Sequence, residues 1–208
     1  MTTSSIQIIA EDAVAVAVGD AEQAQTLAAA LRMSGDWIET VPGMDSVTIR
    51  FDPSRISLQS ASQRLLSVKK TSRAPAKAAP NALEIAVRYG GASGPDLAEI
   101  CTQLGLTEAD FIARHTAQTY PVEMIGFTPG FAYLGGLDAG LSVPRRARPR
   151  THVPAGSIGI SGSYSGLYAM PGPGGWPLIG RTDQTLFDAA AETPFLIQPG
   201  QLIHFTAA

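Results

Sequence analysis

The sequence predicts an α+β N-terminal domain over residues 1–80, followed by a mostly β domain over residues 81–208. Three observations support this division. Up to about residue 70, apolar strand-like runs alternate with helical segments. Residues 69–82 are basic and rich in Pro and Ala, which is typical of a boundary between domains. After residue 120, short apolar runs alternate with Gly/Pro turns, which indicates a β-barrel or a sandwich.

The N-terminal half reads in the order β-β-α-β-β-α. The expected strands cover residues 6–9, 13–18, 37–41 and 47–51, and the expected helices cover residues 21–33 and 56–70. Gly35 marks the end of the first helix, and Asp52-Pro53-Ser54 is the expected cap of the second. Strands followed by helices that pack on one face of their sheet make a small α+β sandwich.

The C-terminal half begins with an alternating strand at residues 83–89. A helix is expected from Pro95-Asp96 to residue 104, and a second at residues 108–116, where Thr107-x-x-Asp110 resembles a capping signature. Later strands are expected at residues 122–125, 157–160, 166–170, 177–179, 193–197 and 201–205.

Composition and charge argue against several classes of protein. A formal net charge of −3 gives no reason to expect nucleic acid or an anionic membrane as a partner. No apolar run reaches the roughly 18 residues that a transmembrane helix needs. The single cysteine, Cys101, cannot form an internal disulfide and suits a reducing compartment. We therefore expect a soluble, cytoplasmic protein without a nucleic-acid or membrane partner.

Residues 126–150, GFTPGFAYLGGLDAGLSVPRRARPR, differ from the rest of the chain. Three aromatic residues, Phe127, Phe131 and Tyr133, lie between glycines and prolines, and four arginines follow within residues 145–150. Two interpretations remain open: an ordered loop that carries a functional site, or a structural loop that covers one end of the barrel. The arginines can be a solvated basic loop, a rim that binds carboxylate or phosphate, or a contact with an acidic partner.

The generic catalytic motifs do not occur in this sequence. The three histidines, His115, His152 and His204, are far apart, and there is no CxxC or HxxxH pattern, so we expect no metal site. There is also no phosphate-binding P-loop and no G-x-S-x-G nucleophile elbow. The glycines at 159–162 and 172–175 are typical of turns and bulges, although their backbone N–H groups can also bind an anion.

Five segments occur in the same order as in a known family. They are RYGGASGPDL (88–97), GFTPGFAYL (126–134), PRRARPR (144–150), VPAGSIGI (153–160) and GPGGWPLIGRT (172–182). On these motifs the chain resembles the KipI/PxpB family of 5-oxoprolinase components, also called allophanate hydrolase subunit 1 or carboxyltransferase C–D subdomain. The resemblance is strong over residues 88–205 and weaker before them. It implies a cyclophilin-like barrel in the C-terminal domain.

The resemblance also implies that this chain functions as a subunit of a hetero-oligomer. Family members pair with a larger KipA/PxpC-type subunit (allophanate hydrolase subunit 2) and act with a LamB/YcsF-type subunit. Together they hydrolyse 5-oxoproline, a small cyclic amide, to glutamate with the use of ATP. The isolated chain is expected to be inactive.

Within that function, residue chemistry suggests roles for particular side chains. Arg148, Arg150 and Arg181 are candidates for holding a carboxylate or a phosphate. Glycine-rich backbone, including Gly174 and Gly175, is a candidate source of N–H donors for an oxyanion. His152 and His115 are candidate proton carriers, with a structural role left open for each. The aromatic residues Phe127, Phe131 and Tyr133 are assigned to substrate binding, with a protein-docking role left open.

Two other functions remain open. A KipI-like regulatory protein would bind and inhibit a histidine kinase, with the aromatic residues near position 130 as its docking surface. A carboxyltransferase module of a urea-carboxylase-like system would need a biotin carrier. Tyr164 stands where many relatives have Gln, which puts the identity of the substrate in doubt.

Overall fold

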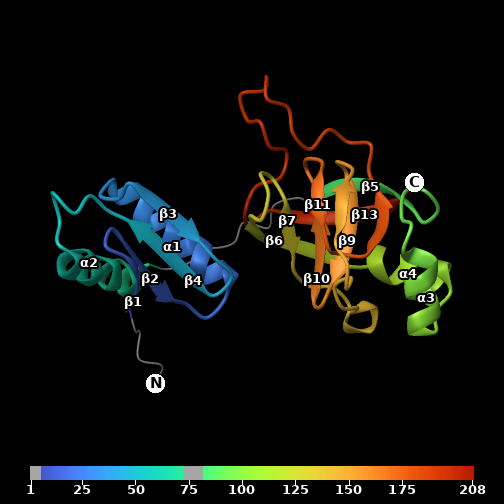
Figure 1. Cartoon of the computed structure of the whole chain (residues 1–208), viewed down its shortest axis with the longest axis horizontal. Helices are drawn as coiled ribbons and strands as arrows, with labels where there is room; N and C mark the ends of the chain where they lie inside the picture. The colour runs from blue at the N-terminus through green and yellow to red at the C-terminus, as the bar shows by residue number, and fades with distance from the viewer. Residues whose placement is uncertain (1–5, 73–81) are drawn as a thin grey trace. The chain divides into compact units, whose positions relative to one another are not determined.

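A computed structural model describes residues 6–72 and 82–208, and the chain divides into two compact units, Met1–Ala79 and Pro80–Ala208 (Figure 1). Each unit has its own apolar core. Most of the linker expected at residues 69–82 lies outside the described residues, and its first three residues belong to a helix.

The N-terminal unit is a four-stranded antiparallel sheet with two helices. Its elements are β1 (Ile6–Ala10), β2 (Ala13–Ala17), α1 (Ala21–Ser34), β3 (Glu39–Pro42), β4 (Ser46–Arg50) and α2 (Leu58–Thr71). The strand order is β1-β2-β4-β3, and Val14 pairs with Ile49 in the register of β2 and β4. These two residues share a buried cluster with Leu27 and Leu31 of α1 and Leu65 of α2. Both helices therefore pack on the same face of the sheet.

The helix ends of this unit follow capping chemistry. In α1, the Asp20 side chain accepts a hydrogen bond from the Gln23 N–H, and Gly35 adopts a left-handed conformation at the C-cap. The expected cap of α2 was wrong. Ser57 is its N-cap, while the Asp52 carboxylate accepts hydrogen bonds from Ser54 inside the preceding turn. Asp favours such local turns as strongly as it favours helix caps.

The C-terminal unit contains a closed barrel of seven strands, which confirms the predicted mostly β barrel. Its elements are β5 (Leu83–Tyr89), α3 (Leu97–Leu104), α4 (Glu108–Thr116), β6 (Thr119–Ile125), β7 (Ala132–Leu134), η1 (Ala139–Leu141), β8 (Arg150–Val153), β9 (Ser157–Ser161), β10 (Tyr164–Leu167), β11 (Gly172–Gly174), β12 (Leu178–Arg181) and β13 (Leu202–Ala207). The order around the barrel is β10-β7-β6-β13-β5-β12-β9, with β13 and β5 parallel and the other neighbours antiparallel. A two-stranded ribbon of β8 and β11 accompanies the barrel. The cyclophilin-like character of the barrel stays a prediction.

The helices α3 and α4 connect β5 to β6 and contribute side chains to the barrel core, among them Ile100 of α3 and Phe111 of α4. The predicted cap of α4 is confirmed, because the Thr107 side chain accepts a hydrogen bond from the Asp110 N–H. None of the helices within the described ranges is both long and apolar enough to cross a membrane.

The connection from β12 to β13 extends away from the barrel (Figure 1). A strand was expected at residues 193–197, but this prediction was wrong: the segment makes one isolated bridge, between Phe187 and Phe195. Their rings lie 4.8 Å apart, and two backbone hydrogen bonds, from Asp188 N–H to the Pro194 carbonyl and from Leu196 N–H to the Leu186 carbonyl, flank the pair at the base of this connection.

Candidate functional site

Four aromatic side chains from different strands and loops form a cluster on the barrel, which we call the aromatic cluster: Phe131, Tyr133, Tyr168 and Trp176. The Phe131 ring lies edge-on to the other three, at centroid distances of 4.8 Å to Tyr133, 4.8 Å to Tyr168 and 5.5 Å to Trp176. Edge-to-face pairs of this kind are favourable because the positive ring edge meets the negative ring face. The cluster therefore fixes the position of residues 131–133 within the 126–150 segment.

Glycines make room for these rings. A Cβ atom at position 166 would lie 2.6 Å from the Trp176 ring and 2.7 Å from the Phe131 ring. At position 174 it would lie 2.5 Å from the Tyr168 hydroxyl. Gly174 was assigned to an oxyanion site, and the structure buries it against Tyr168, so its small size already has a packing reason.

Phe127 has an unusual backbone and an exposed side chain. It is the one non-glycine residue with positive φ, at 70°, in the part of the chain that the structure describes. Its side chain is 64% exposed and lies edge-on to Phe131 at 5.8 Å. A bulky residue in the left-handed region is strained, and such strain concentrates at functional positions.

Beside the aromatic cluster lies a group of charged side chains, Asp96, Arg146 and Arg150, which we call the Asp96–arginine group. The Asp96 Oδ1 atom accepts hydrogen bonds from Arg146 Nη1 and Arg150 Nη2, each at 2.8 Å. Its Oδ2 atom accepts the Leu178 N–H at 2.6 Å. Asp96 is 5% exposed, while the two arginines keep part of their surface in solvent.

Backbone and side-chain contacts join this group to the aromatic cluster. The Arg146 N–H donates to the Gly175 carbonyl at 2.8 Å, and Arg150 pairs with Gly174 between β8 and β11. The Arg145 guanidinium lies 6.0 Å from the centre of the Trp176 ring, at the outer limit of a cation–π contact. Together the aromatic cluster, of which Phe131, Tyr168 and Trp176 are buried, and the charged group, whose arginines reach solvent, form one region, which we call the aromatic–arginine site.

The electrostatics of this region favour an ionised Asp96. Burial opposes its ionisation, but hydrogen bonds from Arg150 and the Leu178 N–H, together with the charges of both arginines, outweigh burial and lower the pKa of the carboxyl group. Burial raises the pKa of Tyr168, so this hydroxyl stays protonated at neutral pH. The region therefore presents neutral hydroxyls and an excess of positive charge.

Tyr164, the residue that departs from the relatives' pattern, lies beside the aromatic cluster. Its ring is edge-on to Tyr133, at a centroid distance of 6.3 Å. Burial raises the pKa of its hydroxyl, and the charge of Glu123 and a hydrogen bond with that carboxylate add to the effect.

His115 lies in the barrel core, away from solvent. Its Nδ1 is 2.7 Å from the Tyr89 hydroxyl and its Nε2 is 3.1 Å from Ser165 Oγ, and the rings of Phe111 and Phe205 stack on it. Burial lowers the pKa of His115 to about 3, so the ring is neutral. Because the side chain is fully buried and both nitrogens are engaged, we do not carry His115 into the proposed site.

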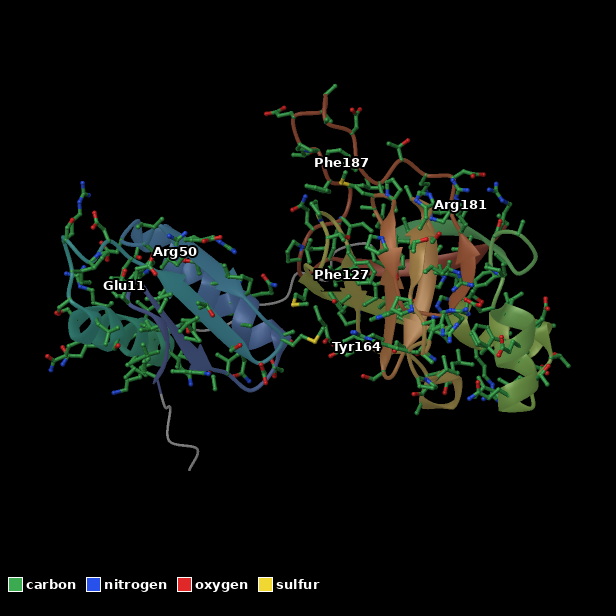
Figure 2. The ribbon with its side chains drawn as sticks, viewed as in Figure 1. Glu11, Arg50, Phe127, Tyr164, Arg181 and Phe187 are labelled. Atoms are coloured by element: carbon green, nitrogen blue, oxygen red, sulfur yellow. The ribbon has the colours of Figure 1, made fainter. Side chains whose placement is uncertain are left out.

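The other predicted polar residues lie in different places. His152 is exposed on β8, two residues from Arg150. Arg148 is exposed and does not share the Asp96 carboxylate. Arg181 donates from Nε to the Ala155 carbonyl at 3.0 Å and lines a separate cavity of about 260 Å³ with Gln184 and Phe187. Figure 2 shows Arg181 well apart from Phe127 and Tyr164.

Sequence reasoning missed three residues of this region: Asp96, Arg146 and Trp176. Asp96 was noted only as a helix start, yet its side chain makes no capping hydrogen bond. A buried acid opposite a run of arginines was the signal available, because four cations within six residues need an acceptor. The partner of those arginines is about fifty positions away in the sequence, and only the fold brings it there.

Residues 4–197 match the family model described as carboxyltransferase domain, subdomain C and D. The B-type subunit of 5-oxoprolinase from Escherichia coli O157:H7 is 43% identical over 169 residues, which cover 81% of this chain and 77% of that protein. The Haemophilus influenzae protein of the same name is 41% identical over 175 residues, which cover 84% of this chain and 81% of that protein.

The crystal structure of TTHA0988 superposes with a TM-score of 0.82 at 34% identity, and the superposition covers 95% of this chain. This chain spans 40% of that longer one. On these matches, the chain belongs to the KipI/PxpB family of carboxyltransferase C–D subdomain proteins.

Proposed function

We propose that this chain is the B-type subunit of a 5-oxoprolinase, a hydrolase complex that opens 5-oxoproline to glutamate. The observation that carries the proposal is 43% identity, over most of both chains, to a protein that bears this name. The aromatic–arginine site supports it chemically, because it places positive charge next to aromatic side chains. A small cyclic amide with one carboxylate needs both.

Ring opening requires three tasks. Water adds to the lactam carbonyl, the C–N bond breaks, and the nitrogen takes up a proton to become the amine of glutamate. A positive group must stabilise the oxyanion of the tetrahedral intermediate, and a titratable side chain must move the proton. In this chain, the Asp96–arginine group supplies positive charge, and the exposed His152 on the neighbouring strand is the proposed proton carrier.

The remaining parts come from other subunits. We propose a larger KipA/PxpC-type subunit and a LamB/YcsF-type subunit as partners, in a cytoplasmic complex that uses ATP. This sequence has no P-loop, so any nucleotide site in this chain is of another kind. Phe127, strained and 64% exposed, is the proposed contact with a partner subunit. The isolated chain is therefore expected to be inactive.

Reconstitution tests this function. The chain is purified alone, with each proposed partner, and with both, and the release of ADP and glutamate is measured with 5-oxoproline as substrate. We expect 5-oxoproline-dependent ATP hydrolysis only in the full mixture. Turnover of urea or allophanate by the full mixture, without turnover of 5-oxoproline, would overturn the proposal.

The exposure of Phe127 also fits a second function, a KipI-like protein that binds a histidine kinase. Capture of purified kinase by the chain, abolished by Phe127→Gly and blocked by the larger partner subunit, would favour this regulatory role. Capture of the larger subunit alone would favour the enzyme.

A further inference from the structure

We propose that Arg146 and Arg150, held in place by Asp96, bind the carboxylate group of a small ligand, with Asp96 as a positioning residue. The inference names the ligand chemistry of the region described above, and it rests on the proposed function only for the identity of that ligand. Arg146 and Asp96 were in none of the sequence-based assignments. Arg148, which was, lies outside the group.

The charge of the group is unbalanced. Two guanidinium groups share one carboxylate, so the group carries a net charge of one positive unit. Asp96 accepts three hydrogen bonds, two from the arginines at Oδ1 and one from the Leu178 N–H at Oδ2, which uses most of its acceptor sites. The charge of the second arginine is therefore left for an anion from outside the group.

The arginines also keep donors without an acceptor. Arg146 Nε and Arg150 Nη1 are buried and have no hydrogen-bond partner in the structure. A buried donor without an acceptor is costly, so native structures rarely retain one without a reason. The arginine side chains themselves are 35% and 23% exposed, so an anion can reach them from solvent. The second arginine and this exposure point to an anion that completes the group.

The net charge selects the kind of anion. One surplus positive charge matches a monoanionic carboxylate, and paired guanidinium groups suit its planar oxygens. A phosphate dianion would stay under-neutralised unless Arg145 or Arg148 turned towards it. The adjoining Trp176 and Tyr168 are only 6% and 2% exposed, so the apolar surface beside the arginines is small and suits a ligand whose remaining atoms form a compact uncharged ring.

Ligand-observed NMR on the full chain tests the inference with three probes. L-5-oxoproline carries the carboxylate, 2-pyrrolidinone has the same ring without it, and inorganic phosphate is the alternative anion. We expect saturable binding of L-5-oxoproline, at least tenfold weaker binding of 2-pyrrolidinone, and weaker binding of phosphate. If phosphate binds more tightly than L-5-oxoproline, the carboxylate assignment is wrong.

Three variants with the same change in charge locate the site. Arg146→Gln and Arg150→Gln should each weaken L-5-oxoproline binding at least tenfold, whereas Arg148→Gln should change it less than twofold. Each of the first two leaves Asp96 with one arginine, and unchanged unfolding midpoints would verify that the variants fold. Equal losses in all three variants would mean nonspecific attraction to a basic segment and would overturn the inference.

The same variants in the reconstituted complex separate this inference from the proposed function. If the wild-type complex turns over 5-oxoproline and Arg146→Gln and Arg150→Gln leave its KM unchanged, the carboxylate site is wrong and the function stands. If the complex is inactive but the chain binds L-5-oxoproline with the predicted pattern, the site stands and the function fails. Absence of saturable binding together with an unchanged KM overturns the site.

Discussion

His115 and Asp96 are two buried polar side chains of the barrel unit, and their surroundings differ in kind. His115 is neutral, both of its ring nitrogens are engaged, and aromatic rings pack on its faces. Asp96 is ionised, and it is shared by two cations that retain buried donors without partners. One group is complete within the chain, and the other is not.

We infer from this difference that His115 is a structural polar group and that the Asp96–arginine group is the proposed recognition site. Folding alone favours buried polar groups that are neutral or fully paired, because every unpaired donor or charge raises the free energy of the folded state. Trp37 Nε1 is also buried without a partner, but it carries no charge, whereas the Asp96–arginine group combines unpaired donors with a surplus positive charge that an external anion can balance. Burial and depth do not make this distinction, since both side chains are buried. The two groups differ in whether every buried donor has an acceptor within the chain.

The largest effect on stability is expected from Asp96→Asn. The substitution removes the charge that both arginines need, and it leaves two partly buried guanidinium groups facing each other. Loss of one partner of a fully buried pair costs about 3–5 kcal/mol, and the partial exposure of both arginines reduces this to roughly 2–3 kcal/mol. Urea unfolding followed by Trp176 fluorescence, in a Trp37→Phe background, measures the change in the barrel unit.

Arg146→Gln provides the matched control for this substitution. It removes one of two cations and leaves Asp96 paired with Arg150, so the free energy of unfolding should fall by less than about 1 kcal/mol. If Asp96→Asn and Arg146→Gln destabilise the chain equally, the Asp96–arginine group is a structural pair like any other, and its contrast with His115 disappears.

The second effect is a pH dependence that His115 gives to the folded state. Burial lowers the pKa of His115 to about 3, whereas in the unfolded chain it is near 6.5. Between these values only the unfolded chain binds the proton, so this contribution to stability is present above pH 6.5 and is lost as the pH falls towards 3. Between pH 7 and pH 5 the loss amounts to roughly 2 kcal/mol.

His115→Gln should remove that part of the pH dependence, because glutamine does not titrate. At neutral pH the variant should also be less stable, since glutamine cannot reproduce both hydrogen bonds to Tyr89 and Ser165. His152→Gln serves as the control, because it removes an exposed histidine of the same unit. Urea unfolding at several pH values gives the comparison, and parallel curves for wild type and His115→Gln would contradict the neutral, buried ring.

The parts of the fold that the sequence predicts are those with local signals. Both ends of the helix at residues 108–116 were predicted correctly, because its N-cap contact joins Thr107 and Asp110, which are close in the sequence. The short strands β7, β8 and β11 were missed, since they are three or four residues long and two of them contain or adjoin Gly and Pro. Their pairing depends on distant strands, which no local pattern reveals.

The same limit applies to the site. The motif at residues 126–150 was singled out for its composition, and the structure brings its Phe131, Tyr133 and Arg150 into one region. The choice among its arginines was not available from spacing. Arg146 and Arg148 look alike in the sequence, and only Asp96, about fifty residues earlier, distinguishes them.

The smallest effect on stability, and the most specific one, is expected at Phe127. Its positive φ suits glycine, so Phe127→Gly relieves backbone strain of order 1 kcal/mol. Two effects oppose this gain: the edge-on contact with Phe131 is lost, and the unfolded chain becomes more flexible at this position. These terms nearly cancel, and the free energy of unfolding should stay within about 1 kcal/mol of wild type. Phe127→Ala keeps the strain and loses the ring, so it should be less stable than Phe127→Gly. Both variants should weaken binding to the larger subunit equally, as measured by titration calorimetry. A loss of several kcal/mol in both variants, with binding to the larger subunit unchanged, would show that the ring serves the fold, as His115 does, and not a partner.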